Sequence, residues 1–223
     1  MTLVDLSHQI TDGMAAYPGL PPVRIFPILD HDESRERYGG RAEFHLGGAE
    51  LAGNTGTYLD APFHRFRERE DLADLPLESV VGLPGLVVDP DGSERAVSLE
   101  GVFETSLRGR ALLVRTGRDA LWGSGEYWLD APFIPAAEFI PAAEVDRLVA
   151  AGVRLVGVDF GNVDDTDDLA RPAHTGLLEA GIPIVENLRG LDRLPRGGFV
   201  FSAPPIAIVR GAAFPVRAFA EVP

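Results

Sequence analysis

The stretch from Asn54 to Phe66 reads Asn-Thr-Gly-Thr-Tyr-Leu-Asp-Ala-Pro-Phe-His-Arg-Phe, and few other short segments of the chain hold as much candidate chemistry. It places the carboxylate of Asp60 four residues before the imidazole of His64, with Pro62 between them. If Asp60 caps a helix that has Pro62 in its first turn, the two side chains face the same way, about one turn apart. The spacing therefore allows Asp60 and His64 to share a metal ion or a proton.

An ordinary helix cap followed by a surface histidine is the competing interpretation of the same spacing. The string Leu-Asp-Ala-Pro-Phe recurs from Leu129 to Phe133, where Ile134 takes the place of the histidine. The five residues alone therefore do not identify a site, and whether Asp60 and His64 form one depends on motifs elsewhere in the chain.

Composition narrows the classes of protein and partner. A chain of 223 residues with 45% hydrophobic content is long enough to bury one large core, and we expect residues 1–223 to form a single domain. The net charge of -14 argues against nucleic acid and against an anionic membrane surface as partners. The sequence has no cysteine, which excludes disulfides, thiol nucleophiles and cysteine-based zinc sites. No signal peptide and no apolar span of about 20 residues is recognisable, so a cytoplasmic protein is the expectation.

The first half of the chain has the patterns of strands and turns. We predict strands from Leu3 to Ile10 and from Val23 to Leu29, the second at an edge because it contains Pro27. Strict alternation of apolar and polar residues from Arg41 to Leu46 predicts a third strand, with His45 on its polar face. His31 lies among acidic residues and is interpreted as part of a polar turn.

Two buried strands, from Leu83 to Val88 and from Ala111 to Arg115, and a short helix from Leu99 to Leu107 are predicted next. The second half then alternates helix and strand. Helices are expected from Pro141 to Ala151 and from Pro172 to Ala180, each with proline at its start and glycine after its end.

A strand follows each of these helices, from Val153 to Val158 and from Ile182 to Val185, and this order predicts a parallel pair. Sites in such sheets lie beyond the carboxyl ends of the strands, where Asp159 and Glu186 fall. The acidic run from Asp164 to Asp168 lacks the glycine and final glutamate of a calcium loop, so we interpret it as a solvated capping turn. The chain is predicted to be an α/β domain with a mixed parallel and antiparallel sheet.

Several separated motifs, in order along nearly the whole chain, resemble the cyclase family of metal-dependent hydrolases, which includes bacterial kynurenine formamidase and isatin hydrolase. The motifs are Asp5-Leu6-Ser7, Tyr17-Pro18-Gly19, Gly56-Thr57 with Asp60, Pro62 and His64, His174 with Leu177-Leu178, Gly181-Ile182 with Val185-Glu186-Asn187-Leu188, and Pro215-Val216-Arg217-Ala218. The resemblance implies a swivelling β/β/α fold, a homodimer or homotetramer, and a zinc or manganese site.

The family's main motif is His-x-Gly-Thr/Ala-His-x-Asp-x-Pro-x-His. Carried over onto this sequence, the resemblance implies that the metal ligands are Asp60, His174 and Glu186. It implies that His64 moves protons in the reaction and that Tyr17 takes the position of a pocket aromatic that contacts the substrate.

The sequence departs from this motif at Asn54 and Tyr58, which stand where two metal-binding histidines are expected. An amide oxygen is a weak ligand for zinc, and a phenol with a pKa near 10 must first lose its proton. We therefore expect at most one divalent metal, zinc or manganese, and a chain without any metal is the alternative. Tyr58 is a candidate catalytic donor to a developing oxyanion, and Asn54 a candidate substrate contact.

These residues favour hydrolysis of an amide, cyclic amide or ester in a small molecule, with aromatic substrates included. One alternative is a non-catalytic family member that binds a small molecule or a partner through the same cleft. The other is a lyase or isomerase that works without metal and uses Tyr58 and His64 as acid and base.

Overall fold

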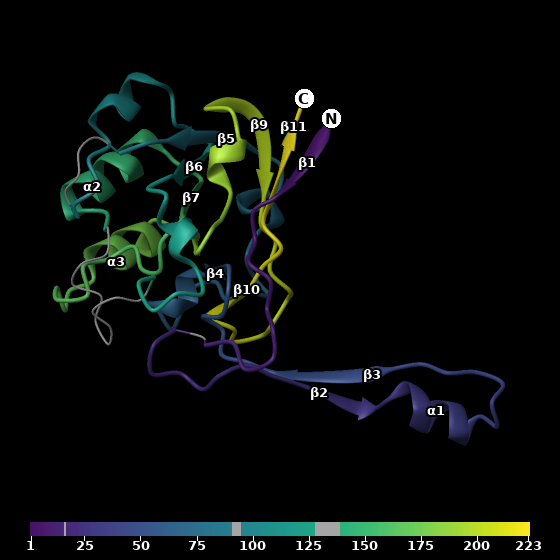
Figure 1. The fold of residues 1–223 in the computed structure, drawn as a ribbon. Helices are drawn as coiled ribbons and strands as arrows, with labels where there is room; N and C mark the ends of the chain where they lie inside the picture. The colour runs from purple at the N-terminus through teal and green to yellow at the C-terminus, as the bar shows by residue number, and fades with distance from the viewer. Residues whose placement is uncertain (16, 91–94, 128–138) are drawn as a thin grey trace.

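The computed structural model describes residues 1–15, 17–90, 95–127 and 139–223, so the repeated string at Leu129 to Phe133 lies outside the described residues. A nine-stranded sheet forms the body, in the order β1-β11-β9-β5-β6-β7-β8-β4-β10 (Figure 1). Its strands are β1 (Thr2–Asp5), β4 (Tyr58–Asp60), β5 (Leu83–Val88), β6 (Ala111–Val114), β7 (Leu155–Val158), β8 (Ile184–Glu186), β9 (Gly197–Ser202), β10 (Ala213–Pro215) and β11 (Phe219–Val222).

The middle of the sheet is parallel and both of its faces are buried. β5, β6, β7 and β8 pair in parallel, whereas the flanking strands pair antiparallel. Along β6, Leu113 belongs to one hydrophobic cluster and Leu112 to the other, as expected for a strand covered on both sides. The cluster that contains Leu113 includes buried residues of seven strands, and Val4 of β1 and Phe214 of β10 pack against it, so the sheet curls around this cluster. The predicted α/β fold with a mixed sheet is confirmed.

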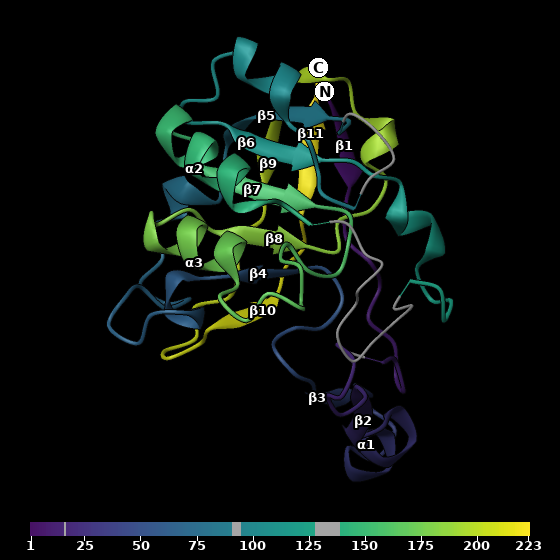
Figure 2. The same cartoon turned by 90° about the vertical axis from the view of Figure 1, so that its left-hand side faces the viewer.

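Two helices, α2 (Ala142–Ala151) and α3 (Pro172–Glu179), lie side by side on the outer face of β6, β7 and β8 (Figure 2). α2 ends at Gly152, whose φ of 73° is left-handed, and α3 has Pro172 in its first turn. These are the signals from which both helices were predicted, and both are confirmed. They pack on the second cluster through Val145, Leu148, Leu177 and Leu178.

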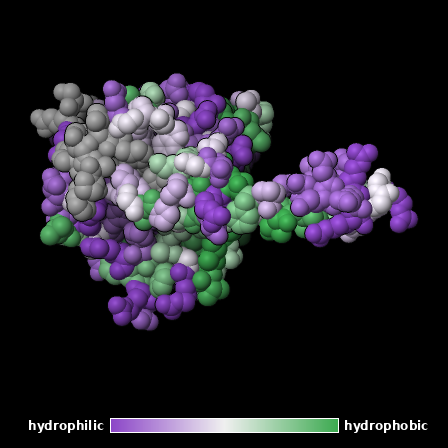
Figure 3. Space-filling view, turned by 60° about the horizontal axis from the view of Figure 1, so that its bottom comes forward, coloured by the Kyte–Doolittle hydropathy of each residue, from purple (hydrophilic) through white to green (hydrophobic). Residues whose placement is uncertain are grey.

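A separate arm projects from the body. It consists of β2 (Arg24–Leu29), α1 (His31–Arg37) and β3 (Leu46–Glu50), and β2 and β3 form a two-stranded sheet. Figure 3 shows hydrophobic residues where the arm leaves the body and mainly hydrophilic residues toward its tip.

Two predictions for the arm are wrong. His31 begins a helix rather than lying in a turn, because Asp30 and Glu33 form a capping box. The third strand runs over Leu46–Glu50 and not from Arg41 to Leu46. Alternation predicts a strand only where one face is buried. Residues 41–45 lie near the arm's tip, where no core covers them, and the backbone of Phe44 hydrogen-bonds the Ser34 hydroxyl of α1 instead of a neighbouring strand.

Other differences concern the bounds of elements. The first strand ends at Asp5 instead of Ile10, and the helix expected from Leu99 to Leu107 is a short 3-10 turn, η3. The 3-10 turns of the described chain are η1 (Pro62–His64), η2 (Leu77–Ser79), η3 (Glu100–Glu104), η4 (Arg118–Leu121) and η5 (Leu191–Arg193). None of the helices within the described ranges has the length and apolar character that crossing a membrane requires.

Candidate active site

The register of two short strands brings the first site residues together. β4 and β8 pair antiparallel, with Tyr58 opposite Glu186 and Asp60 opposite Ile184. Alternate residues of a strand share a face, so Tyr58, Asp60 and Glu186 all lie on the face of Ile184. Ile184 packs in the second cluster beneath α3, and these three polar side chains therefore face α3.

α3 supplies His174 from its buried face, which it shares with Leu177 and Leu178. Asp164 holds this histidine in place: its Oδ2 lies 2.6 Å from His174 Nδ1, and its carboxylate also accepts from the backbone N–H groups of Ala173 and His174. The acidic turn thus caps α3 as predicted, but Asp164 is only 3% exposed, so the prediction of a solvated turn is wrong at this residue. A carboxylate on Nδ1 leaves Nε2 free to bind a metal.

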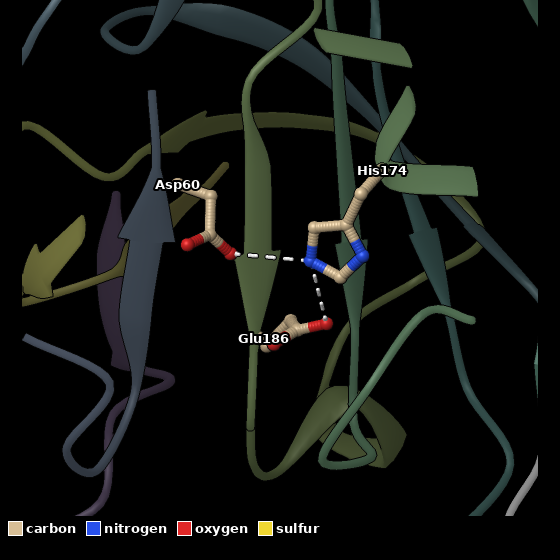
Figure 4. Close-up of side chains that lie close together, drawn as sticks. All are labelled: Asp60, His174 and Glu186. Carbon is tan, nitrogen blue, oxygen red and sulfur yellow. Dashed lines mark ion pairs between the residues drawn. The ribbon is translucent and has the colours of Figure 1, made fainter. Parts of the chain in front are cut away.

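Figure 4 shows His174 Nε2 between the two carboxylates. It lies 3.8 Å from Asp60 Oδ2 and 3.7 Å from Glu186 Oε1. One ligand atom from each of Asp60, His174 and Glu186 falls within 4.8 Å of the others. Both oxygens of Asp60 are buried and have no hydrogen-bond partner within the described residues.

A buried carboxylate without hydrogen bonds is costly unless a cation satisfies it. One imidazole and two carboxylates form a donor set suited to zinc or manganese, with room for water at an open position. The residues therefore fit a single divalent metal, held by Asp60, His174 and Glu186.

The pKa values of His174 and Glu186 are both raised in this site. Burial lowers the pKa of His174, but the hydrogen bond that its ring donates to Asp164 and the interactions with Asp60 and Glu186 outweigh burial and raise this pKa to about 10. Burial, together with the charge of Asp60, raises the pKa of Glu186 to about 7. Without metal the imidazole holds a proton that compensates the carboxylates, and metal binding has to displace that proton.

Tyr58 is fully buried, and its hydroxyl donates a hydrogen bond to Glu186 Oε2. Burial and the charges of Glu186 and Asp60 raise the pKa of Tyr58 well above 10, while a hydrogen bond with Asn54 acts in the opposite sense. The phenol is therefore protonated at neutral pH. Glu186 receives a second hydrogen bond at Oε1 from the backbone N–H of Val163, at 2.7 Å. Tyr58 and Val163 together fix the orientation of Glu186.

His64 closes η1, directly after the buried strand β4. The expectation that Asp60 caps this turn is wrong: Asp60 is the last residue of β4, and Ala61 takes the cap position without a side-chain hydrogen bond. The reason is that the carboxylate of Asp60 points into the site. The predicted proximity is present nonetheless, since His64 Nδ1 lies 3.4 Å from Asp60 Oδ1. The side chain of His64 is 32% exposed and so reaches solvent.

A cavity of about 320 Å³ opens over these residues. Every residue predicted for the site lines this cavity except Asp60, which lies buried beneath it. Its lining consists of Tyr17, Leu20, Asn54, Tyr58, His64, Arg65, Asn162, Arg171, His174 and Glu186. Sequence reasoning missed Arg65, Asn162 and Arg171. The available signals were that Arg65 directly follows His64 and that Arg171 directly precedes the helix that carries His174.

Of the two carboxylates predicted at the carboxyl ends of the parallel strands, only Glu186 lies in the site. Asp159 accepts hydrogen bonds from the backbone N–H groups of Thr116 and Gly117 and from the Thr116 hydroxyl. It therefore holds the loop that follows β6.

Solved structures share this fold. Isatin hydrolase A from Labrenzia aggregata matches with a TM-score of 0.84 at 24% identity, over 99% of this chain and 93% of that one. Isatin hydrolase A from Ralstonia solanacearum matches with a TM-score of 0.81 at 23% identity, over 100% and 92%. The architecture is thus that of the isatin hydrolases.

Sequence comparison identifies the family. The family model described as putative cyclase matches residues 4–165. Kynurenine formamidase from Salinibacter ruber is 33% identical over 98% of this chain and 96% of its own length. Kynurenine formamidase from Bacillus cytotoxicus is 30% identical over 96% and 95%. The chain belongs to the cyclase family of metal-dependent hydrolases.

Proposed function

We propose that this protein hydrolyses the C–N bond of an N-formyl group or a cyclic amide in a small aromatic molecule, as a kynurenine formamidase-like enzyme with one zinc or manganese ion. The observation that carries the proposal is that Asp60, His174 and Glu186 converge, and that both buried oxygens of Asp60 have no hydrogen-bond partner within the described residues. The names of the relatives, kynurenine formamidase and isatin hydrolase, support the choice of bond and of substrate class.

A bound metal supplies Lewis acidity toward a carbonyl oxygen and lowers the pKa of water. His64 stands beside this site with one ring nitrogen toward Asp60 and part of its ring in the cavity. As water adds to the carbonyl carbon, His64 accepts a proton from it and returns that proton to the nitrogen that leaves when the C–N bond breaks. Tyr17 and Asn54 line the cavity and are proposed to contact the substrate.

The proposal is tested with protein purified without a chelating tag and a panel of formanilide, isatin and an aromatic lactone. We expect hydrolysis of at least the formamide or the cyclic amide, lost after chelation and restored by about one equivalent of zinc or manganese. Metal content is measured on the same samples by elemental analysis.

Two results would contradict the proposal. Protein that carries its metal and turns over no compound of the panel would favour the non-catalytic binding interpretation. Turnover that survives complete removal of metal would show that the chain hydrolyses these compounds without a metal, with Tyr58 and His64 as the acid and base.

We expect Tyr58→Phe to weaken metal binding. The change removes the hydroxyl that donates to Glu186 Oε2 and leaves that oxygen without this donor inside a buried site. Loss of such a supporting hydrogen bond lowers metal affinity by about 10 to 100-fold. Competition with a fluorescent chelator measures the dissociation constant, and kcat is measured at saturating metal.

Tyr127→Phe is the matched control, since Tyr127 is equally buried and its hydroxyl donates to Asn187 Oδ1 at 2.6 Å, outside the metal ligands. It should leave metal affinity unchanged. If Tyr58→Phe instead keeps its metal affinity and loses about 10² to 10³ in kcat, the hydroxyl donates to the developing oxyanion, as the sequence suggests.

We further infer that residues 1–223 act as one domain in the cytoplasm and assemble as a homodimer or homotetramer. The arm supports the assembly, because its strands pair only with each other within the described residues and it exposes Ile25, Ile28 and Leu46. Apolar side chains on a projecting element are typical of subunit contacts. A solution mass equal to one chain would contradict this assembly.

A further inference from the structure

Two guanidinium groups line the cavity above the proposed metal ligands, those of Arg171 and Arg65. Within the described part of the chain, no carboxylate lies within ion-pair distance of either group. The chain has 34 acidic residues against 20 Lys and Arg, so carboxylates are in excess elsewhere. One wall of the cavity is therefore cationic, and no carboxylate of the described residues pairs directly with it.

Arg171 is half-buried, and its polar contacts are neutral. Its Nη1 donates to Asn162 Oδ1 at 3.2 Å, and its side chain also hydrogen-bonds the Tyr17 hydroxyl. Asn162 in turn donates from Nδ2 to the same hydroxyl, at 3.2 Å. A guanidinium has five N–H donors in a fixed fork, and these neutral contacts leave donors for a planar anion.

The backbone also holds Arg171 in an unusual position. Its φ of 50° and ψ of 60° are left-handed, a conformation that non-glycine residues rarely adopt. Residues kept in such conformations cluster at ligand sites, where the surrounding structure fixes them. Pro172 and the capped start of α3 follow directly, so the side chain is attached to a rigid element.

Arg65 is exposed at the edge of the same cavity. It donates from Nε to Thr175 Oγ1 and from Nη2 to the carbonyl oxygen of Ala170, both at 3.0 Å. These contacts tie η1, which carries His64, to the segment around Arg171. Arg65 adds positive charge near Arg171, but two of its N–H groups already donate to Thr175 and Ala170.

From this arrangement we propose that the substrate carries a carboxylate, which binds the Arg171 guanidinium while its scissile amide lies at the metal ligands. This inference rests on the proposed function, because it names the substrate class of the same site. The competing explanation is that the two guanidinium groups only offset the negative charge of Asp60, Asp164 and Glu186. That explanation predicts that Arg171→Lys, which keeps the charge, binds the carboxylated ligand as well as the native protein does, and so the two are separable.

The test compares formanilide, which is neutral, with 2-, 3- and 4-formamidobenzoate, which carry a carboxylate at different positions. We expect the best carboxylated probe to have a KM at least about 10-fold below that of formanilide. Arg171→Gln should raise this KM by about 10 to 100-fold, the worth of a charge-assisted bidentate hydrogen bond. The KM for formanilide should rise by less, so that the preference for the carboxylated probe falls by about 10-fold or more, and metal content should stay within about two-fold.

Two further variants sharpen the result. Arg171→Lys keeps the charge but loses the fork, and should fall between the native protein and Arg171→Gln. Arg217→Gln is the matched control, since Arg217 is ion-paired with Asp5 on the surface and 79% exposed. It should leave every constant unchanged.

Binding without turnover keeps the inference testable if the proposed hydrolysis fails. Zinc-loaded protein is titrated calorimetrically with 2-aminobenzoate and with aniline. We expect native protein to bind the carboxylate more tightly than aniline, and Arg171→Gln to lose that preference. A native protein without the preference, an Arg171→Gln variant that retains it, or an equal loss for both ligands together with loss of metal would each overturn the inference.

Discussion

Asp60→Asn is expected to lose the metal and the activity together. The variant replaces two buried carboxylate oxygens, neither with a hydrogen-bond partner in the described structure, by one weakly ligating oxygen and an NH₂ group that donates. That NH₂ group would face His174 and the cavity floor where a cation is expected. We expect bound metal to fall from about one equivalent to below about a tenth and kcat/KM to fall by about 10³-fold or more. Elemental analysis and assays on the same preparation measure both.

His174→Ala and Glu186→Gln should behave alike, because each removes one of the three ligands. Asp159→Asn is the matched control: Asp159 is another fully buried aspartate at the end of a strand, and burial raises its pKa to about 6. Its partners are Thr116 and Gly117, so its replacement should affect thermal stability and leave metal content intact. Full metal retention in Asp60→Asn would place the metal elsewhere or remove it from the mechanism.

His64→Ala is expected to retain the metal and to lose kcat by about 10² to 10⁴-fold, the usual contribution of a positioned acid and base. The ring stands 3.4 Å from Asp60 and lines the cavity, but it is not one of the three groups that converge on a common point. It can therefore reach a substrate and a water molecule while the ligands stay in place. Steady-state kinetics and metal analysis of one preparation separate the two roles.

His45→Ala provides the control for a histidine change, because His45 is exposed on the arm, away from the cavity lining. It should leave kcat unchanged. Loss of metal from His64→Ala would move His64 into the ligand set, and an unchanged kcat would exclude it from proton transfer.

Local sequence signals predicted the elements on which the site is built. Proline at the start and glycine after the end marked α2 and α3, since these residues act on the backbone of their own turn and need no distant partner. The spacing of Asp60 and His64 predicted their proximity for the same reason: side chains four residues apart in a compact turn stay close whether that turn is capped or not. The resemblance to the family pointed to the three ligands, and the fold brings them together.

The remaining features depend on register and on long-range packing. Tyr58 reaches Glu186 because β4 and β8 pair with those two residues opposite each other, 128 positions apart in the chain. A shift of one residue would turn Tyr58 and Asp60 to the other face of the sheet, and no pattern within either strand specifies this register. The failed strand prediction from Arg41 to Leu46 has a related cause, because alternation predicts a strand only where a core covers one side, and the arm has none there.

The sequence by itself thus determined the α/β class, the helices around the site and the residue types that could bind a metal, because these depend on composition and on neighbours within a turn or two. Only the tertiary structure decided that Asp164 orients His174, that Tyr58 is protonated and bonded to Glu186, and that Arg171 lines the same cavity without a carboxylate partner among the described residues. Each of these features depends on burial and on the close approach of segments distant in the chain, and both arise only when the sheet has folded.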